Sequence, residues 1–378
     1  MSVKLLAFAT PEQEMLVDTT ARFIEKTLPL AKVRELAESA GNPDTDYVQT
    51  ASSLGWFGLL VDEAHGGGSA SGNGLLDAAA VGAERGAVLQ PGPFVGLNVV
   101  AHALSADGPR HGALLERLVA GQTRATWVAG TVGGLTPGPG EIVARSDGDG
   151  YVVDGEVRLV HDVAGCETLL VSALGPGGPV QVLIGADAAG VEVRALSGLD
   201  VTRRVCAVRL RGVQARADAV VGVPGAPTEA RLRQQLAVAA VLCAAESAGA
   251  MHTEFETALE YAKARIAFGR PIGSFQAIKH LLADTSLSLE MAKGLVAAAA
   301  EALGEGRPDG IELAHAAKAF VAERGVELAH ACFQVFGGIG YTWEHDHHLF
   351  MRRLAADAVA FGSADWHRGR LAEQIGAD

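Results

Sequence analysis

The sequence predicts an α+β protein in three parts: an N-terminal α-helical domain over residues 1–121, a central antiparallel β-barrel or sandwich over 122–222, and a C-terminal four-helix bundle over 228–378. Two observations predict this order. From about residue 123 to residue 221, alanine-rich helical sequence gives way to short valine runs punctuated by glycine and proline. No strand–helix–strand alternation occurs there, which excludes a Rossmann unit and favours an antiparallel sheet.

Composition narrows the class of protein. With 378 residues and 49% hydrophobic content, the chain has room for two or three domains and a substantial core. A formal net charge of −13 argues against a nucleic-acid-binding or anionic-membrane-binding surface. The 4 cysteines are scattered and form no C-x-x-C pair, so neither a disulfide framework nor a metal site is expected.

Apolar runs are short. The first ten residues hold too short a run for a signal peptide, and the run Leu236–Ala245 is broken by Glu246 before it could span a bilayer. Reduced thiols fit the cytoplasm. We therefore expect a soluble, cytoplasmic protein that binds neither nucleic acid nor membrane.

The first helix carries local start signals. Thr10 is a helix cap, Pro11 occupies the first turn, and Glu12 lies at the positive end of the helix dipole, so an amphipathic helix is expected through about Leu36. The glycine run Gly66–Gly68 has the composition of a phosphate cradle. It lacks the lysine and the preceding strand of a P-loop, so a plain loop is the better interpretation.

The central part contains strand signals. Tyr151–Val160 has the pattern of a hairpin with Asp154-Gly155 at the turn. Further short strands are expected at Leu169–Ala173, Val180–Ile184, Val191–Leu196 and Val205–Leu210.

Long helical patterns return after a linker at Pro224–Pro227. The first begins at Thr228 and contains Glu246. Further helices are expected at about Ser274–Leu303, Pro308–Phe336 and from Asp346 to the C-terminus, with Ser274 as a cap. Four antiparallel helices form a bundle.

The turn after the first long helix concentrates charge. Lys263, Arg265 and Arg270 crowd a helix end that Gly269 and Pro271 terminate. One interpretation is an αα-hairpin with a solvated basic rim. The other is a guanidinium at Arg265 aimed at a phosphate, since arginine pairs with phosphate oxygens in a bidentate manner.

The order of these residues resembles the acyl-CoA dehydrogenase family, which carries R-x-x-F-G-x-x-I-x-x-x-Q in its C-terminal domain. Here that pattern runs from Arg265 to Gln276. A second family-like stretch, Gln334–Tyr341, is followed by Leu349–Arg353. The pattern is closest to bacterial members that degrade steroids and branched acids.

The resemblance implies FAD as cofactor, an acyl-CoA thioester as substrate and an electron-transfer flavoprotein or similar acceptor. It also implies a homotetramer, or a heterotetramer with a homologous subunit, in which each flavin lies between two chains. One chain would supply Arg265 to the pyrophosphate, and Phe268 and Gln276 beside the flavin. Three further residues would lie at the adenosine side: Gln334, Gly337 and Gly338. A helix C-cap turn is the alternative for these glycines taken alone.

The residues of the other half of the flavin site depart from the family pattern. Members carry T-E-P-x-A-G-S where this chain has Gly130–Gly134, and W-I-T or W-I-S where it has approximately Val160-His161-Asp162. The tryptophan that shields the flavin is therefore missing.

The resemblance also implies a carboxylate base that removes the proton from Cα of the acyl-CoA. The usual positions of this base hold other residues in this chain. Where many members have a catalytic glutamate, this chain has Phe361, and at the alternative position on the first bundle helix it has Ala239. Glu246 is the remaining acid within the otherwise apolar run of that helix, and we expect it to be the base. A structural ion pair is the competing interpretation of Glu246, because ion-pair networks also bury acids.

Three function classes remain. The first is FAD-dependent α,β-dehydrogenation of an acyl-CoA in a bacterial degradative pathway. The second is a non-catalytic or half-catalytic subunit that completes the flavin site of a sister chain. The third is a flavin monooxygenase or nitroalkane oxidase on the same fold.

The cluster Glu344–His348 suggests a metal site, but adjacent positions at a helix start point apart, so no metal is expected.

Overall fold

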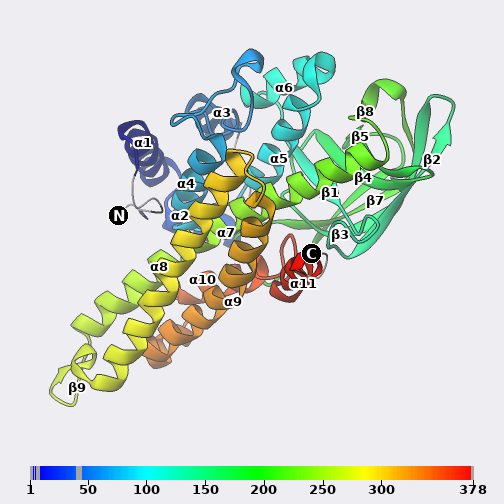
Figure 1. The fold of residues 1–378 in the computed structure, drawn as a ribbon. Coiled ribbons are helices and arrows are strands. Elements are labelled where there is room, and N and C mark those ends of the chain that lie inside the picture. Colours follow the sequence, from blue (N-terminus) through cyan, green and yellow to red (C-terminus); the bar gives the residue numbers. More distant parts are fainter. Residues whose placement is uncertain (1–2, 4, 6–8, 40–44, 376–378) are drawn as a thin grey trace.

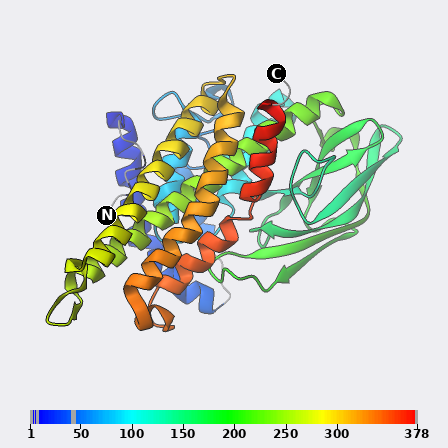
Figure 2. The same cartoon turned by 60° about the horizontal axis from the view of Figure 1, so that its bottom comes forward.

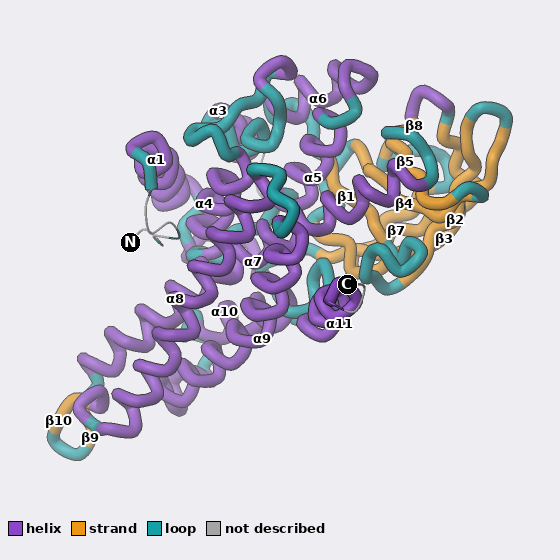
Figure 3. Tube along the Cα trace, viewed as in Figure 1, coloured by secondary structure: helices purple, strands orange, loops and turns teal. Residues whose placement is uncertain are grey.

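The computed structural model describes every residue except 1–2, 4, 6–8, 40–44 and 376–378. The N-terminal helices and the long C-terminal helices pack into one helical body, and the sheet stands at one side of it (Figures 1 and 2). Figure 3 shows the strands gathered there, apart from one small hairpin at the far tip of the long helices. The predicted order of helical, β and helical parts is confirmed, and the exact domain boundaries stay predictions.

The N-terminal part consists of short helices. These are α1 Pro11–Thr27, α2 Leu30–Glu38, α3 Thr45–Ser53, α4 Gly74–Gly86, α5 Phe94–Ser105 and α6 Gly112–Val119, with 3₁₀ turns η1 Glu63–His65 and η2 Gly108–His111. Thr10 caps α1 as predicted, because Gln13 N donates to Thr10 Oγ1 and Thr10 N donates to Gln13 Oε1. The predicted continuation to Leu36 is wrong: α1 ends at Thr27, and Pro29, which has no N–H, separates it from α2.

The central sheet is mixed. Its strands are β1 Ala125–Ala129, β2 Gly140–Asp147, β3 Gly150–His161, β4 Thr168–Gly175, β5 Gly178–Gly185, β6 Val191–Leu196, β7 Val205–Ala215 and β8 Val220–Val221. They lie in the order β6-β7-β3-β2-β4-β5-β8. Most neighbours are antiparallel, as predicted, whereas β1 runs parallel to β4 and β2 meets β4 in parallel at one residue pair.

The predicted turn at Asp154-Gly155 is wrong. The hairpin turns at residues 148–149, and Asp154-Gly155 lies inside β3. The pairing of β3 with β7 shifts register between Val153 and Gly155, which makes a β-bulge. Gly155 has φ +143°, and a Cβ there would lie 2.2 Å from the Glu141 carbonyl oxygen. Glycine is therefore required by a close backbone approach within the sheet.

The C-terminal part is dominated by α7 Ala226–Ala264, which is 39 residues long. It is followed by α8 Gln276–Gly304, α9 Gly310–Phe336, the 3₁₀ turn η5 Gly337–Tyr341, α10 His347–Asp357 and α11 Ala364–Ile375. The predicted last helix is thus split into two. Among the described residues, α7 alone is long and apolar enough to cross a membrane, but 94% of its apolar window is buried inside the protein, as for a core helix.

A small hairpin joins α7 to α8. Its strands are β9 Ile266–Ala267 and β10 Arg270–Pro271, followed by the 3₁₀ turn η4 Ile272–Ser274. The predicted capping role of Ser274 is wrong. Phe275 is the residue that precedes α8, and the buried Ser274 Oγ has no hydrogen-bond partner in the described part of the chain.

Buried charges join the three parts of the molecule. Arg203, in the connection between β6 and β7, reaches Glu246 Oε2 of α7 at 2.5 Å and Asp357 Oδ1 of α10 at 2.7 Å. Arg85 of α4 lies 3.4 Å from Glu246 Oε1. Burial opposes the charged guanidinium, but Asp357, Glu246 and Asp162 outweigh it and raise the pKa of Arg203 well above its usual value. This group, called here the junction network, ties α4, the sheet, α7 and α10 together.

The break between α10 and α11 is held by buried side chains. Lys318 of α9 donates to the carbonyl oxygens of Asp357 (2.9 Å) and Gly362 (3.1 Å). His367 Nε2 lies 3.1 Å from the Phe361 carbonyl oxygen, so it is the protonated nitrogen, and His367 Nδ1 accepts from His315 Nδ1 at 2.7 Å. Burial lowers the pKa of His367 to about 3 and that of His315 to about 4, so both rings are neutral.

Removing the central cation should destabilise the whole chain. We expect Arg203→Met to lower the free energy of unfolding by about 3–5 kcal/mol, because Asp357 is left buried with an unpaired charge and Glu246 keeps only its longer contact with Arg85. The matched control is Arg211→Met on β7, whose side chain is 68% exposed, and its effect should stay below about 1 kcal/mol. Urea unfolding measures both. Equal effects of the two substitutions would contradict the role of the junction network.

Acid should also weaken the fold. In the unfolded chain a histidine binds its proton near pH 6.5, whereas folded His315 and His367 bind theirs near 4 and 3, so the unfolded state binds more protons below 6.5. The stability that the two neutral histidines contribute is fully present above about pH 6.5 and is lost as the pH falls toward 4. Between these values, each histidine contributes up to about 1.4 kcal/mol per pH unit. His315→Gln should flatten the curve of unfolding free energy against pH, and the exposed His280→Gln should leave it unchanged. Parallel curves for wild type and His315→Gln would disprove this account.

Candidate functional site

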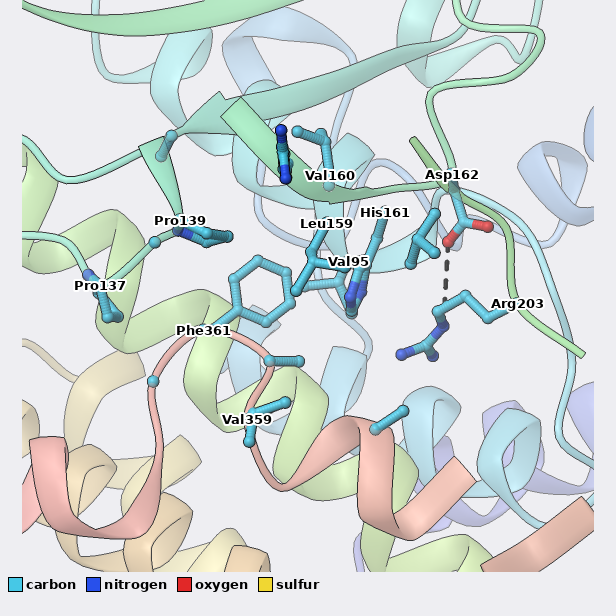
Figure 4. A pocket seen from close by; sticks show the side chains of 18 of the residues that line it. Val95, Pro137, Pro139, Leu159, Val160, His161, Asp162, Arg203, Val359 and Phe361 are labelled. Carbon is cyan, nitrogen blue, oxygen red and sulfur yellow. Dashed lines mark ion pairs between the residues drawn. The ribbon is translucent and has the colours of Figure 1, made fainter. Parts of the chain in front are cut away.

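A cavity of about 520 Å³ lies where the sheet, the N-terminal helices and the α10–α11 connection meet. This volume falls within the usual range of small-molecule sites. Figure 4 shows Pro137, Pro139 and Phe361 toward one end of the cavity, and Asp162 and Arg203 at the other. The cavity therefore has largely apolar walls and a charged end.

Glu246, the sequence-predicted base, lines this cavity but is already paired. Its side chain is 2% exposed, and its two carboxylate oxygens lie against Arg85 and Arg203. Both carboxylate oxygens are therefore already engaged by guanidinium groups of the same chain. The geometry of Glu246 is that of the structural ion pair.

Asp162, at the charged end, is less engaged. The described residues give its carboxylate no hydrogen bond, and its one ion-pair contact is Arg203 Nε at 4.0 Å. Burial raises the pKa of Asp162, and Arg203 and Arg353 oppose that shift. The neighbouring His161 is neutral, because burial, Arg203 and Arg353 lower its pKa to about 3. Neither side chain was assigned a role from the sequence.

Phe361 lies in the cavity at the position where the resemblance would place a base. Its ring packs edge-on against His161 with centroids 5.5 Å apart. Three cavity residues with side chains have positive φ: Leu159 (58°), Asp162 (52°) and Phe361 (55°). Such backbone is costly for residues other than glycine and is concentrated at functional sites.

The FAD-contact residues expected from the sequence lie elsewhere. Arg265, Phe268 and Gln276 are exposed at the α7–α8 tip, at the opposite end of the molecule from the sheet (Figures 1 and 3). Phe268 is 93% exposed. Within the described residues, the Arg265 side chain has no hydrogen-bond or ion-pair partner. The tip therefore presents an unpaired guanidinium and an uncovered aromatic ring to solvent.

The glycine loop points outward at the same end of the helical body. Gln334, Gly337 and Gly338 are exposed where α9 ends and η5 begins. Gly337 has φ +62°, and a Cβ at Gly337 or Gly338 would meet nothing within 4 Å. The space above both glycines is thus open to a ligand or a neighbouring chain.

The histidine cluster forms ordinary contacts. His347 Nδ1 pairs with the buried Glu254 of α7, and His348 Nε2 lies 3.1 Å from the Trp343 carbonyl oxygen. In the described part of the chain, no three histidine, cysteine, aspartate or glutamate side chains are placed to hold a metal ion.

The junction network was not predicted from the sequence. Arg203 follows the short run Asp200-Val201-Thr202, and such a buried-arginine loop has no local signal that separates it from a surface turn. An arginine in a loop after a strand is usually exposed. The partners of Arg203 are 43 and 154 residues away, so its burial depends on the tertiary fold.

Comparisons with known proteins identify relatives along most of the chain. Residues 10–111 match the model of the acyl-CoA dehydrogenase N-terminal domain, and residues 230–376 match that of the C-terminal domain. The chain is 29% identical to the acyl-CoA dehydrogenase IpdE2 of Mycobacterium tuberculosis (strain ATCC 25618 / H37Rv), over 96% of this chain and 97% of IpdE2. It is 32% identical to FadE34 of the same organism over 84% of this chain, but it spans only 40% of that longer protein.

Two solved structures of acyl-CoA dehydrogenases have the same fold as this chain. A variant of the Tcur3481-Tcur3483 steroid ACAD superposes with a TM-score of 0.85 at 27% identity, covering 97% of this chain and 98% of that one. Butyryl-CoA dehydrogenase from Megasphaera elsdenii has the same fold, with a TM-score of 0.85 at 21% identity and coverage of 98% and 100%. The two domain models, the relatives and the shared fold together show that this chain belongs to the acyl-CoA dehydrogenase family.

Proposed function

We propose that this chain is the subunit that completes the flavin site of a neighbouring, homologous acyl-CoA dehydrogenase chain. Members of the family are flavoprotein oxidoreductases that act on CH–CH groups, and FAD is their cofactor. The observation that carries this proposal is the unpaired, exposed guanidinium of Arg265 at a tip remote from the chain's own cavity.

The tip fits the pyrophosphate side of FAD. Arg265 offers a planar set of N–H donors that matches phosphate oxygens, and no carboxylate of the described chain competes for it. The open backbone at Gly337 and Gly338 leaves room for the nucleotide. FAD supplies the hydride acceptor when bound; Arg265, Phe268, Gln276 and the glycine loop would bind and orient it for the neighbour.

The residues of the chain's own cavity support the same proposal. At one usual base position stands Phe361, which cannot accept a proton, and the other holds Ala239, buried in α7. Glu246 is occupied by two arginines. A general base must be free to take the proton, so this arrangement favours a chain that donates binding residues.

The proposed assembly is a heterotetramer acting on an acyl-CoA in a bacterial degradative pathway. The Tcur3481-Tcur3483 ACAD, which is 27% identical, bears the names of two components. An electron-transfer flavoprotein or similar acceptor would reoxidise the flavin. We also propose a cytoplasmic location, with which the four free, buried cysteines agree.

Flavin content tests the role of Arg265. Expressed alone, the chain should hold little FAD, and co-expression with its homologous partner should yield a flavin-containing mixed assembly. Arg265→Ala should lower FAD per assembly at least about tenfold, since a charge-assisted pair to phosphate is lost. Visible absorbance after gel filtration measures the ratio.

The matched control is Lys263→Ala, an exposed cation at the same helix end that already pairs with Glu260. It should leave FAD content unchanged. One FAD per chain in protein expressed alone, or an unaltered FAD content in Arg265→Ala, would refute the half-site proposal.

A second candidate is that the chain dehydrogenates acyl-CoA itself with Glu246 as base. It is favoured by one observation: Glu246 lines the cavity as a buried carboxylate on the long bundle helix. Desolvation of the site and movement of Arg203 would have to release the carboxylate before it could take the α-proton.

Glu246→Gln separates the two candidates. If Glu246 is structural, the variant in the mixed assembly should be reduced by acyl-CoA at the parental rate, with only the stability lowered. If Glu246 is the base, flavin reduction should slow by at least about a hundredfold. Anaerobic stopped-flow bleaching of the flavin measures the rate, and retained FAD absorbance confirms that the variant is assembled.

A further inference from the structure

The charged end of the cavity contains polar atoms that the fold leaves unsatisfied. Arg203 Nε is buried and has no hydrogen-bond partner within the described residues. The Asp162 carboxylate, whose Oδ2 is 4.0 Å away, accepts no hydrogen bond from the same residues. Buried polar groups are normally paired, so an unpaired acceptor beside an unpaired donor at a cavity wall indicates a place for a ligand.

Asp162 faces the cavity because of its backbone. Side chains alternate along a strand, so the residue after His161 would ordinarily point to the other side of β3. Asp162 has φ +52°, a left-handed conformation that aspartate tolerates, and both side chains line the cavity. Figure 4 shows the Asp162 carboxyl group turned toward Arg203, with His161 between it and Phe361.

Charge balance selects the kind of group that fits there. An anion would meet Asp162 and the other acids of the junction network, whereas a cation would meet Arg203 and Arg85. A neutral O–H group avoids both repulsions and can donate to the Asp162 carboxylate. Much of the remaining wall is apolar or aromatic, with Val95, Leu159 and Phe361 around the space, and the polar lining residues there are Thr126, Thr136, Arg158, Asp200 and Ser363.

We propose that the cavity of this chain binds a neutral, apolar molecule that carries a hydroxyl group, with the hydroxyl donating to Asp162 and the apolar body packed against Phe361, Leu159 and Val95. The volume of about 520 Å³ is more than three times the roughly 150 Å³ that holds a benzene, so the apolar body can be larger than a single ring. This site is separate from the Arg265 tip, and the inference rests on the proposed half-site function, in which the cavity of this chain, lined by Val160–Asp162 and Phe361, holds no flavin.

A pair of probes tests the hydroxyl requirement. The probes are 2-naphthol and 2-methylnaphthalene, which have the same ring system and differ by a hydroxyl or a methyl group of similar size. For the chain in the assembly from which it is purified, 2-naphthol should bind at least about tenfold more tightly, the usual effect of a hydrogen bond to a charged acceptor. Equilibrium dialysis gives both dissociation constants.

Asp162→Gly identifies the acceptor, because glycine keeps the left-handed backbone and removes the carboxylate. The ratio of the two dissociation constants should fall to about one, because a change in the cavity volume affects both probes alike and cancels in the ratio. Asp187→Gly, on an exposed loop, should retain the wild-type ratio.

The ratio of the two dissociation constants in the wild-type chain is a sufficient test by itself, so a failure of Asp162→Gly to fold does not prevent the test. Equal affinities for the two probes, or no binding of either one, would contradict it, as would a ratio preserved in folded Asp162→Gly. FAD content, which depends on the tip, would be unaffected by any of these results and continues to test the half-site function separately.

Discussion

The arrangement of the whole molecule depends on Arg203. One guanidinium, supplied by a loop of the sheet, satisfies a carboxylate on α7 and another at the end of α10, while Arg85 of α4 shares the first of these. Ions buried this deeply are tolerated only when they are paired, so the sheet and the helices cannot separate without exposing or orphaning charge. The cavity exists at this junction because these charges fix how the three parts meet.

The same constraint determines what the cavity can do chemically. The carboxylate that the family resemblance suggests as a base is the one that the junction network uses for structure. The loop on which many family members carry the base instead carries Phe361, and Lys318 and His367 hold that loop by its carbonyl groups. These two observations are the basis on which we propose a binding role for the chain, carried by the exposed residues of the α7–α8 tip.

Local sequence signals succeeded where their partners are close in the chain. The Thr10 cap depends on Gln13, three residues away, and the length of α7 follows from an uninterrupted helical pattern. The errors arose where the same residue types serve two purposes. Asp154-Gly155 has turn chemistry, yet it forms a bulge because β7 pairs with β3 there, and no local pattern reports that pairing.

The sequence by itself determined the three-part fold and the residues of the exposed tip, because helical periodicity, strand composition and the arginine–phenylalanine–glycine spacing are all local. The tertiary structure decided the roles of Glu246, Asp162 and Arg203. A carboxylate in water, between two guanidinium groups or at a cavity wall is the same letter in a sequence. Its chemistry depends on which charges surround it, and for Glu246 those charges come from positions 43 and 161 residues away.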